Sequence, residues 1–161
     1  METEALADAL ERDHRMIDEG IAAFMAGPRA GDKQSLLRAI GALRRHIYLE
    51  EALLFPMLVE NEPALTAPVF VMLREHGQLW QLLDSLEQEL AGSGGDALAL
   101  CRKLTILLVH HNPKEERVLY PQADELLTER AATLFRDFIA AGQLPPGWAC
   151  AKAGAVRGLR A

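Results

Sequence analysis

Three short clusters of helix-breaking residues divide the chain into long segments of helical character. The clusters are AGPRAGD at 26–32, ENEPAL at 60–65 and AGSGGD at 91–96. Between them Ala, Leu, Glu and Arg dominate and runs of β-branched residues are almost absent, as is typical of helices. The predicted helices span residues 3–26, 33–60, 66–91 and 96–128, followed by a shorter helix at 129–141. Four long helices with short connections predict an all-α fold, an antiparallel up-down-up-down four-helix bundle.

The length of 161 residues favours a single domain. We expect residues 1–141 to form the bundle with its short C-terminal helix. Residues 142–161, GQLPPGWACAKAGAVRGLRA, are rich in Gly and Pro and show little periodicity. This tail is expected to be loosely ordered, with Trp148 as the residue that could pin it to the bundle.

Each of the four long predicted helices carries an apolar stripe at steps of three and four residues, the pattern of a bundle core. The four stripes are Leu10, His14, Ile17, Ile21, Phe24; Leu36, Ala39, Leu43, His46, Glu50, Leu53, Met57; Val69, Met72, His76, Leu79, Leu83, Leu86, Leu90; and Cys101, Leu104, Leu108, His111, Glu115, Val118, Gln122. A histidine interrupts every stripe, and a glutamate interrupts two of them one turn later.

These interruptions would be costly in an ordinary core. An unpartnered buried carboxylate costs several kcal/mol, and a whole domain is stable by only about 5–15 kcal/mol. The six side chains must therefore be exposed, paired with one another, or bound to cations. Because all four helices place a histidine at a core position, the pattern favours a metal site.

An internal repeat supports the same interpretation. The segments HIYLEEALLFP (46–56) and HNPKEERVLYP (111–121) align without gaps, and LERDH (10–14) corresponds to MLREH (72–76). A His and a Glu four residues apart lie on one helix face and can bind the same metal or an adjacent pair. The chain is thus two copies of one unit, which predicts two His-His-Glu sets facing each other across the core.

The repeat also selects between the adjacent histidines of the fourth helix. It pairs His111 with His46 and Glu115 with Glu50, whereas using His110 would bring Lys103 onto the buried stripe. His110 is then a flanking residue. Glu51 and Glu116 are expected either to form outward ion pairs or to accept hydrogen bonds from the ligands.

Prolines follow the predicted ligands in both copies of the repeat. Pro56 and Pro121 each remove a backbone donor and should kink or end the helix. Pro113 lies between the two fourth-helix ligands, where it could open the hydrogen-bond ladder or mark an irregular helix.

Imidazole and carboxylate ligands suit Fe, Mn or Zn. The expected walls of the site are apolar and aromatic, with Phe24, Phe55, Trp80 and Tyr120 as candidates. A dry, narrow pocket suits a diatomic molecule such as O2 or NO better than a large substrate.

Composition argues against several other classes of function. The net charge of −6 and the absence of a basic stripe disfavour nucleic acid as a partner. No apolar run approaches a membrane span, and the acidic start METEALADALERDH lacks the features of a secretory signal. Cys101 and Cys150 form no CxxC pair, which is typical of reduced thiols in the cytoplasm. A homodimer, formed through the tail, stays an open alternative.

The quoted elements resemble the hemerythrin-like (HHE cation-binding) family over residues 6 to about 127. The resemblance implies an oxo- or hydroxo-bridged di-iron centre, with Mn or Zn as alternatives, and its ligands carry over to His14, His46, Glu50, His76, His111 and Glu115. The chain differs from the oxygen-carrying hemerythrins because Met72 and Trp80 flank His76 where a second histidine would stand, and because its fourth helix has HxxxE instead of HxxxxD.

The resemblance therefore implies a di-iron protein that binds or reacts with O2, NO or peroxide, in stress response or sensing. The ligand pattern of this chain is similar to that of di-iron proteins linked to repair of iron–sulfur centres, although their cysteine-bearing N-terminal extension is not present in this sequence. The alternatives are iron storage or donation, for example for iron–sulfur centre repair, enzymatic turnover of a small oxidant or nitric oxide, and a zinc-bound or metal-free interaction module.

Overall fold

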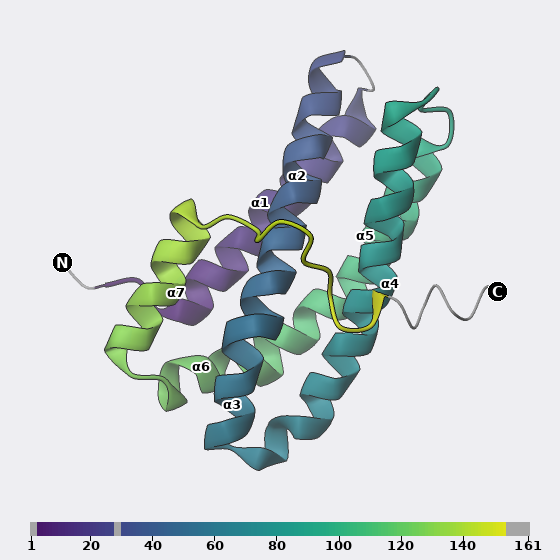
Figure 1. The fold of residues 1–161 in the computed structure, drawn as a ribbon. Helices are drawn as coiled ribbons and strands as arrows, with labels where there is room; N and C mark the ends of the chain where they lie inside the picture. The colour runs from purple at the N-terminus through teal and green to yellow at the C-terminus, as the bar shows by residue number, and fades with distance from the viewer. Residues whose placement is uncertain (1–2, 28–29, 154–161) are drawn as a thin grey trace.

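The computed structural model describes residues 3–27 and 30–153, and this part of the chain is helical with no β-strand. Its helices, labelled in Figure 1, are α1 (Leu6–Ala26), α2 (Ala30–Tyr48), α3 (Phe55–Asn61), α4 (Thr66–Ala91), α5 (Ala97–Lys114), α6 (Tyr120–Leu126) and α7 (Glu129–Ala141). A π-helical turn, η1 (Leu49–Leu54), joins α2 to α3, and a second, η3 (Glu115–Leu119), joins α5 to α6. A 3-10 turn, η2 (Pro63–Leu65), precedes α4.

The predicted four-helix bundle is confirmed. Its four arms are α1, α2–η1–α3, α4 and α5–η3–α6, and Figure 1 shows α1 and α2 side by side, as are α4 and α5. The predicted helix at 129–141 is α7, which begins where the Thr128 hydroxyl accepts a hydrogen bond from the Ala131 N–H. None of the helices in the described ranges is long and apolar enough to cross a membrane.

Two apolar clusters fill the bundle. One contains Ile17, Leu43, Leu79 and Leu108, and the other contains Leu10, Leu49, Met72 and Leu119. Further residues of the arms join both clusters, together with tail residues in the first and residues of η2 and α7 in the second. The four histidines of the stripes lie between these clusters in sequence, so a polar layer separates two apolar halves of the core. Burial of the apolar side chains holds the arms together on both sides of this layer.

The predicted stripes are correct along α1 and α4 but fail beyond the glutamates of the other two arms. Leu53 and Val118, expected in the core, are 38% and 45% exposed, whereas Leu54 and Leu119 are each 1% exposed. Met57 and Gln122 are likewise only partly buried, and Leu58 and Ala123 take the core positions. Each π-helical turn contains one residue more than an α-helical turn, so the buried stripe moves along by one residue.

The first part of the tail lies against the bundle. After α7 the chain crosses α2 towards α4, as Figure 1 shows, and the Trp148 ring makes edge contacts with Tyr48 and Trp80. Cys150 and Ala153 are buried in the apolar cluster that contains Leu79. The remainder of the predicted tail, 154–161, lies outside the described residues.

Candidate metal centre

The two π-helical turns determine which side chains face the polar layer. The Phe55 N–H donates to the Glu50 carbonyl, and the Tyr120 N–H donates to the Glu115 carbonyl, five residues back in both cases. In a regular α-helix, residues five apart point about 140° away from each other. The wider turn brings them towards one face, so each glutamate shares its face with the aromatic residue that follows it.

The prolines of the repeat stand directly after these turns. Pro56 and Pro121 occupy the first turns of α3 and α6, where a missing N–H is tolerated. Each arm therefore continues as a helix after one π-helical turn, so the expected helix end is wrong. Pro113 lies inside α5, which remains α-helical up to Lys114.

All six predicted ligand residues lie in the polar layer with their side chains buried, and each is at most 3% exposed. Glu115 lies between the two pairs of histidines. Its Oε1 is 3.3 Å from His14 Nε2 and 3.1 Å from His111 Nε2, and its Oε2 is 3.5 Å from His76 Nε2. Glu50 Oε1 lies 3.6 Å from His46 Nε2 and 3.3 Å from His76 Nε2.

The side chains form two groups that share one carboxylate. His14, His46 and Glu115 offer ligand atoms within 4.8 Å of one another, and His76, His111 and Glu115 do the same. Glu50 contacts one histidine of each group. The histidine pairs are those that the repeat predicted, but both groups contain Glu115, whereas the repeat predicted a separate glutamate for each set. His110, by contrast, is exposed.

Each buried histidine contacts a second carboxylate through its other ring nitrogen. The Nδ1 atoms of His14, His46, His76 and His111 lie 3.1, 2.7, 2.7 and 2.9 Å from carboxylate oxygens of Glu116, Asp13, Glu51 and Glu75, respectively. An imidazole that donates its Nδ1–H to a carboxylate presents the lone pair of Nε2 and is fixed in orientation. All four rings are therefore prepared to bind a cation on the inner side.

These outer contacts follow the internal repeat. The acid directly before the lone histidine (Asp13 or Glu75) binds the HxxxE histidine of its own copy. The second glutamate of the EE pair (Glu51 or Glu116) binds the lone histidine of the other copy. Of the two roles predicted for Glu51 and Glu116, acceptance of hydrogen bonds from the histidines is the one observed.

Asp13 and Glu75 were missed, although the sequence contains a signal for them. Both lone-histidine elements, LERDH and MLREH, carry an acid immediately before the histidine. The stripes were assigned from the α-helical period alone, which places these acids beside the core stripe. A solvated side chain is the simpler expectation at such a position.

Tyr120 was also missed as a polar member of the centre. Its ring is fully buried, and its hydroxyl oxygen lies 2.9 Å from both His14 Nε2 and His46 Nε2 and 2.8 Å from Glu50 Oε2. Phe55, its counterpart in the repeat, stacks on the His76 ring at a centroid distance of 5.8 Å.

The other two residues expected to wall the site lie elsewhere. Phe24 and Trp80 belong to the apolar cluster of Leu79 and Leu108, whereas Phe55 and Tyr120 belong to the opposite cluster. Trp80 contacts Trp148 of the tail. Trp80, four residues after His76, lies on the face of α4 that points into the bundle. It lies on the opposite side of the polar layer from Phe55 and Tyr120.

The charged side chains of the polar layer shift one another's pKa values. Burial alone would lower the pKa of His76, but the neighbouring carboxylates of Glu115, Glu50 and Glu51 raise that pKa well above its usual range. Burial would raise the pKa of Glu115, yet His111, His14 and His76 hold it well below its usual range. The carboxylates therefore attract positive charge into the core, which either imidazolium groups or metal cations can supply.

Three buried atoms of the layer lack a hydrogen-bond partner among the described residues: Glu50 Oε1, His76 Nε2 and Glu115 Oε2. Leaving such a group unsatisfied costs about 1–3 kcal/mol. The three atoms converge, since His76 Nε2 lies 3.3 and 3.5 Å from the two carboxylate oxygens. A transition-metal cation that accepts imidazole and carboxylate lone pairs would satisfy all three, so the residues fit such an ion.

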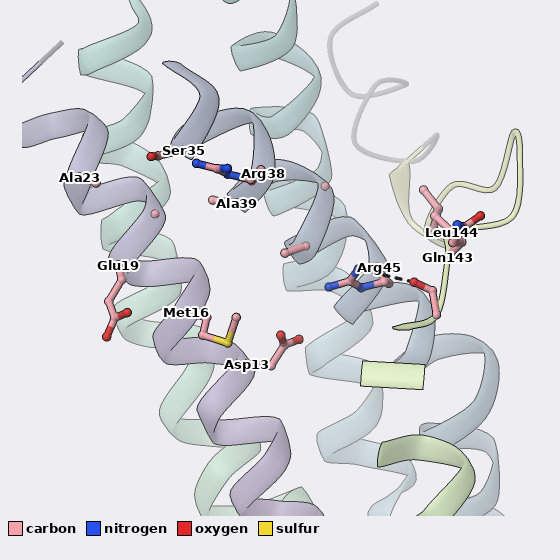
Figure 2. A pocket seen from close by; sticks show the side chains of 14 residues that line it. Asp13, Met16, Glu19, Ala23, Ser35, Arg38, Ala39, Arg45, Gln143 and Leu144 are labelled. Atoms are coloured by element: carbon pink, nitrogen blue, oxygen red, sulfur yellow. Dashed lines mark hydrogen bonds between the residues drawn. The ribbon is translucent and has the colours of Figure 1, made fainter. Parts of the chain in front are cut away.

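Small cavities approach the layer from outside. One of about 70 Å³ lies between α4 and α5 and is lined by Leu79, Leu107, His110 and His111. An open groove of about 450 Å³ between α1 and α5 reaches His14 and Glu116. Figure 2 shows a larger groove between α1, α2 and the start of the tail, which is lined by Asp13 and crossed by the contact from Arg45 to the Gly142 carbonyl.

Comparison with protein families gives one match. The family described as the hemerythrin HHE cation binding domain matches residues 5–123, a range that includes every member of the polar layer. Comparisons with curated proteins and with solved structures give no match.

Proposed function

The chain belongs to the hemerythrin HHE cation-binding domain family, and from this premise we propose that it is a non-haem di-iron protein. In this proposal the centre binds or reacts with O2, NO or peroxide. The observation that carries it is the pair of buried His-His-Glu groups that share Glu115, because two adjacent groups accommodate two ions better than one.

We propose that six side chains hold the ions through nitrogen and oxygen: His14, His46, Glu50, His76, His111 and Glu115. Each imidazole presents Nε2 inward, and its outer carboxylate keeps the ring oriented and raises its basicity. The two glutamates, each close to histidines of both groups, have the reach to bridge the ions. Iron bound here supplies redox chemistry and open positions for a small ligand.

The surroundings favour a small ligand. The layer lies between two apolar clusters that exclude water, and the cavity beside His111 has a volume of about 70 Å³. A water molecule occupies about 30 Å³ in the liquid, so the cavity suits a diatomic molecule. We place this activity in the response to oxidative or nitrosative stress, in the cytoplasm, where the unpaired thiols Cys101 and Cys150 would stay reduced.

Elemental analysis and absorption spectroscopy of the purified protein test the proposal. We expect about two irons per chain and a visible spectrum that changes when O2 or NO is added to the anaerobic reduced protein. The zinc-loaded protein is the control, because Zn²⁺ has no redox chemistry and should show no change. Absence of iron binding, or an iron spectrum that none of O2, NO and peroxide alters, would refute the proposed function.

The same preparation separates this function from iron storage or donation. Buried ligands, each at most 3% exposed, should release iron slowly to a chelator. Rapid and complete transfer to an added chelator or acceptor protein, without a spectral response to the diatomic ligands, would favour donation instead.

A further inference from the structure

Four lone pairs converge on a single phenol in the polar layer. The Tyr120 hydroxyl oxygen lies 2.9 Å from His14 Nε2, 2.9 Å from His46 Nε2, 2.8 Å from Glu50 Oε2 and 3.3 Å from Glu115 Oε1. When both rings are neutral and donate Nδ1–H to Glu116 and Asp13, their Nε2 atoms are acceptors. The two carboxylate oxygens are also acceptors.

With both imidazoles neutral, a neutral tyrosine satisfies only one of these four acceptors, because its hydroxyl carries one proton. The other three lone pairs face the phenol oxygen inside a fully buried site. Such a surplus of acceptors is unfavourable without a cation and favourable around one.

The distances also match those between neighbouring ligand atoms. Nitrogen and oxygen ligands bind transition metals at about 2.0–2.2 Å, so two atoms at adjacent octahedral positions lie about 3 Å apart. The contacts of the Tyr120 oxygen with the two Nε2 atoms and with Glu50 all fall at this spacing.

From these observations we propose that Tyr120 is a metal ligand, which binds through its phenolate oxygen together with His14 and His46. This inference rests on the proposed function, since it concerns the same centre. On binding, the O–H bond of Tyr120 breaks, its electron pair passes to the metal, and one proton leaves to solvent. Phenolate is an established ligand for ferric iron in proteins.

The ligand makes the two halves of the centre unequal. In the repeat the counterpart of Tyr120 is Phe55, which stacks on His76 and has no oxygen to offer. The half formed by His76 and His111 therefore has one protein ligand fewer. A cavity approaches each half, one beside His111 and Glu75 and the other beside His14 and Glu116. The smaller number of protein ligands therefore assigns the open position for the diatomic ligand to the half formed by His76 and His111.

Tyr120→Phe is the direct test, because it removes one oxygen atom and reproduces the residue that the other half already has. We expect the ferric variant to retain about two irons per chain and to lose the phenolate-to-iron charge-transfer absorption of the wild-type protein. Calorimetry in buffers of different ionisation enthalpy should show about one proton fewer released per chain on metal binding.

The chain contains one other tyrosine, which provides a matched control. Tyr48 packs against Phe138 and Trp148, so Tyr48→Phe should keep the wild-type spectrum and proton release. Phe55→Tyr should conversely add a second phenolate absorption.

The outcomes separate this inference from the function on which it depends. A wild-type protein without iron would overturn both. A wild-type protein with two irons whose spectrum is unchanged by Tyr120→Phe would overturn only the role of Tyr120. If the variant fails to fold, resonance Raman spectra of the wild-type ferric protein decide: tyrosinate ring modes support the ligand, and their absence refutes it.

Discussion

His110 and His111 are adjacent in the chain but differ in their environments. His111 is 3% exposed and its two nitrogens contact Glu115 and Glu75, whereas His110 is exposed on the same helix. Neighbouring residues on an α-helix point about 100° apart, so only one of the two can face the centre. We therefore expect the two residues to contribute differently to metal binding.

We expect His111→Ala to lose about half or more of the bound iron, because one histidine pair would lose a member and its outer carboxylate contact. His110→Ala should keep the wild-type iron content. The measurement is iron per chain by elemental analysis on proteins purified in parallel. Equal losses of iron in the two variants would show that the assignment of His111, and not His110, as a ligand is wrong.

At the scale of single residues, most of the centre was predictable from the sequence. His14, His46, Glu50, His76, His111 and Glu115 interrupt apolar stripes, and the repeat selects His111 over His110. Tyr120 was predicted only as a wall of the site and not as a polar member, because an α-helical period of 3.6 residues puts it off the stripe of Glu115. Tyr120 faces the ligands because the π-helical turn widens the helix locally, and a helical wheel of constant period does not include such a turn.

At the scale of elements, the π-helical turns account for the main failure of the sequence-based core. Both lie at the same place in the repeat, directly before Phe55-Pro56 and Tyr120-Pro121. A proline cannot donate a backbone hydrogen bond and its ring clashes with the carbonyl four residues back, so a locally wider turn relieves the conflict. The doubled proline was a visible signal, but it did not reveal whether the helix would bend, stop or widen.

The shift of register predicts different costs for two adjacent leucines. Leu54→Ala should lower the free energy of unfolding by about 2–5 kcal/mol, because it empties a buried position in the core. Leu53→Ala should change it by no more than about 0.5 kcal/mol, since Leu53 is 38% exposed. Chemical denaturation of the two metal-free variants measures both values. A larger loss for Leu53 than for Leu54 would mean that the arm is α-helical throughout.

At the scale of the whole molecule, the two copies of the repeat depend on each other. Glu51 of the first copy contacts His76 of the second, and Glu116 of the second contacts His14 of the first. Neither copy could orient both of its histidines alone. The tail adds a further connection, because the Ala151 N–H donates to Glu51 Oε1 at 2.9 Å. Glu51 therefore contacts both the tail, through the Ala151 N–H, and His76.

The tail packs closely against the bundle at Gly77, next to His76 in α4. A Cβ atom built at this position would lie 2.9 Å from both the Cβ and the carbonyl oxygen of Lys152, closer than real Cβ contacts. Gly41 on α2 offers a matched control, because it is exposed and a Cβ there would meet nothing within 4 Å. By helix propensity alone, alanine would stabilise either position by about 0.5–1 kcal/mol relative to glycine.

We therefore expect Gly41→Ala to raise the free energy of unfolding by about that amount and Gly77→Ala to lower it by about 1–3 kcal/mol through overpacking. Because Lys152 must move to admit the new methyl group, Gly77→Ala should also speed hydrogen exchange in residues 143–153, including the Ala151 amide that binds Glu51. Chemical denaturation and exchange followed by mass spectrometry measure the two effects. Wild-type exchange in this segment, together with a gain in stability like that of Gly41→Ala, would mean that the tail does not pack on α4.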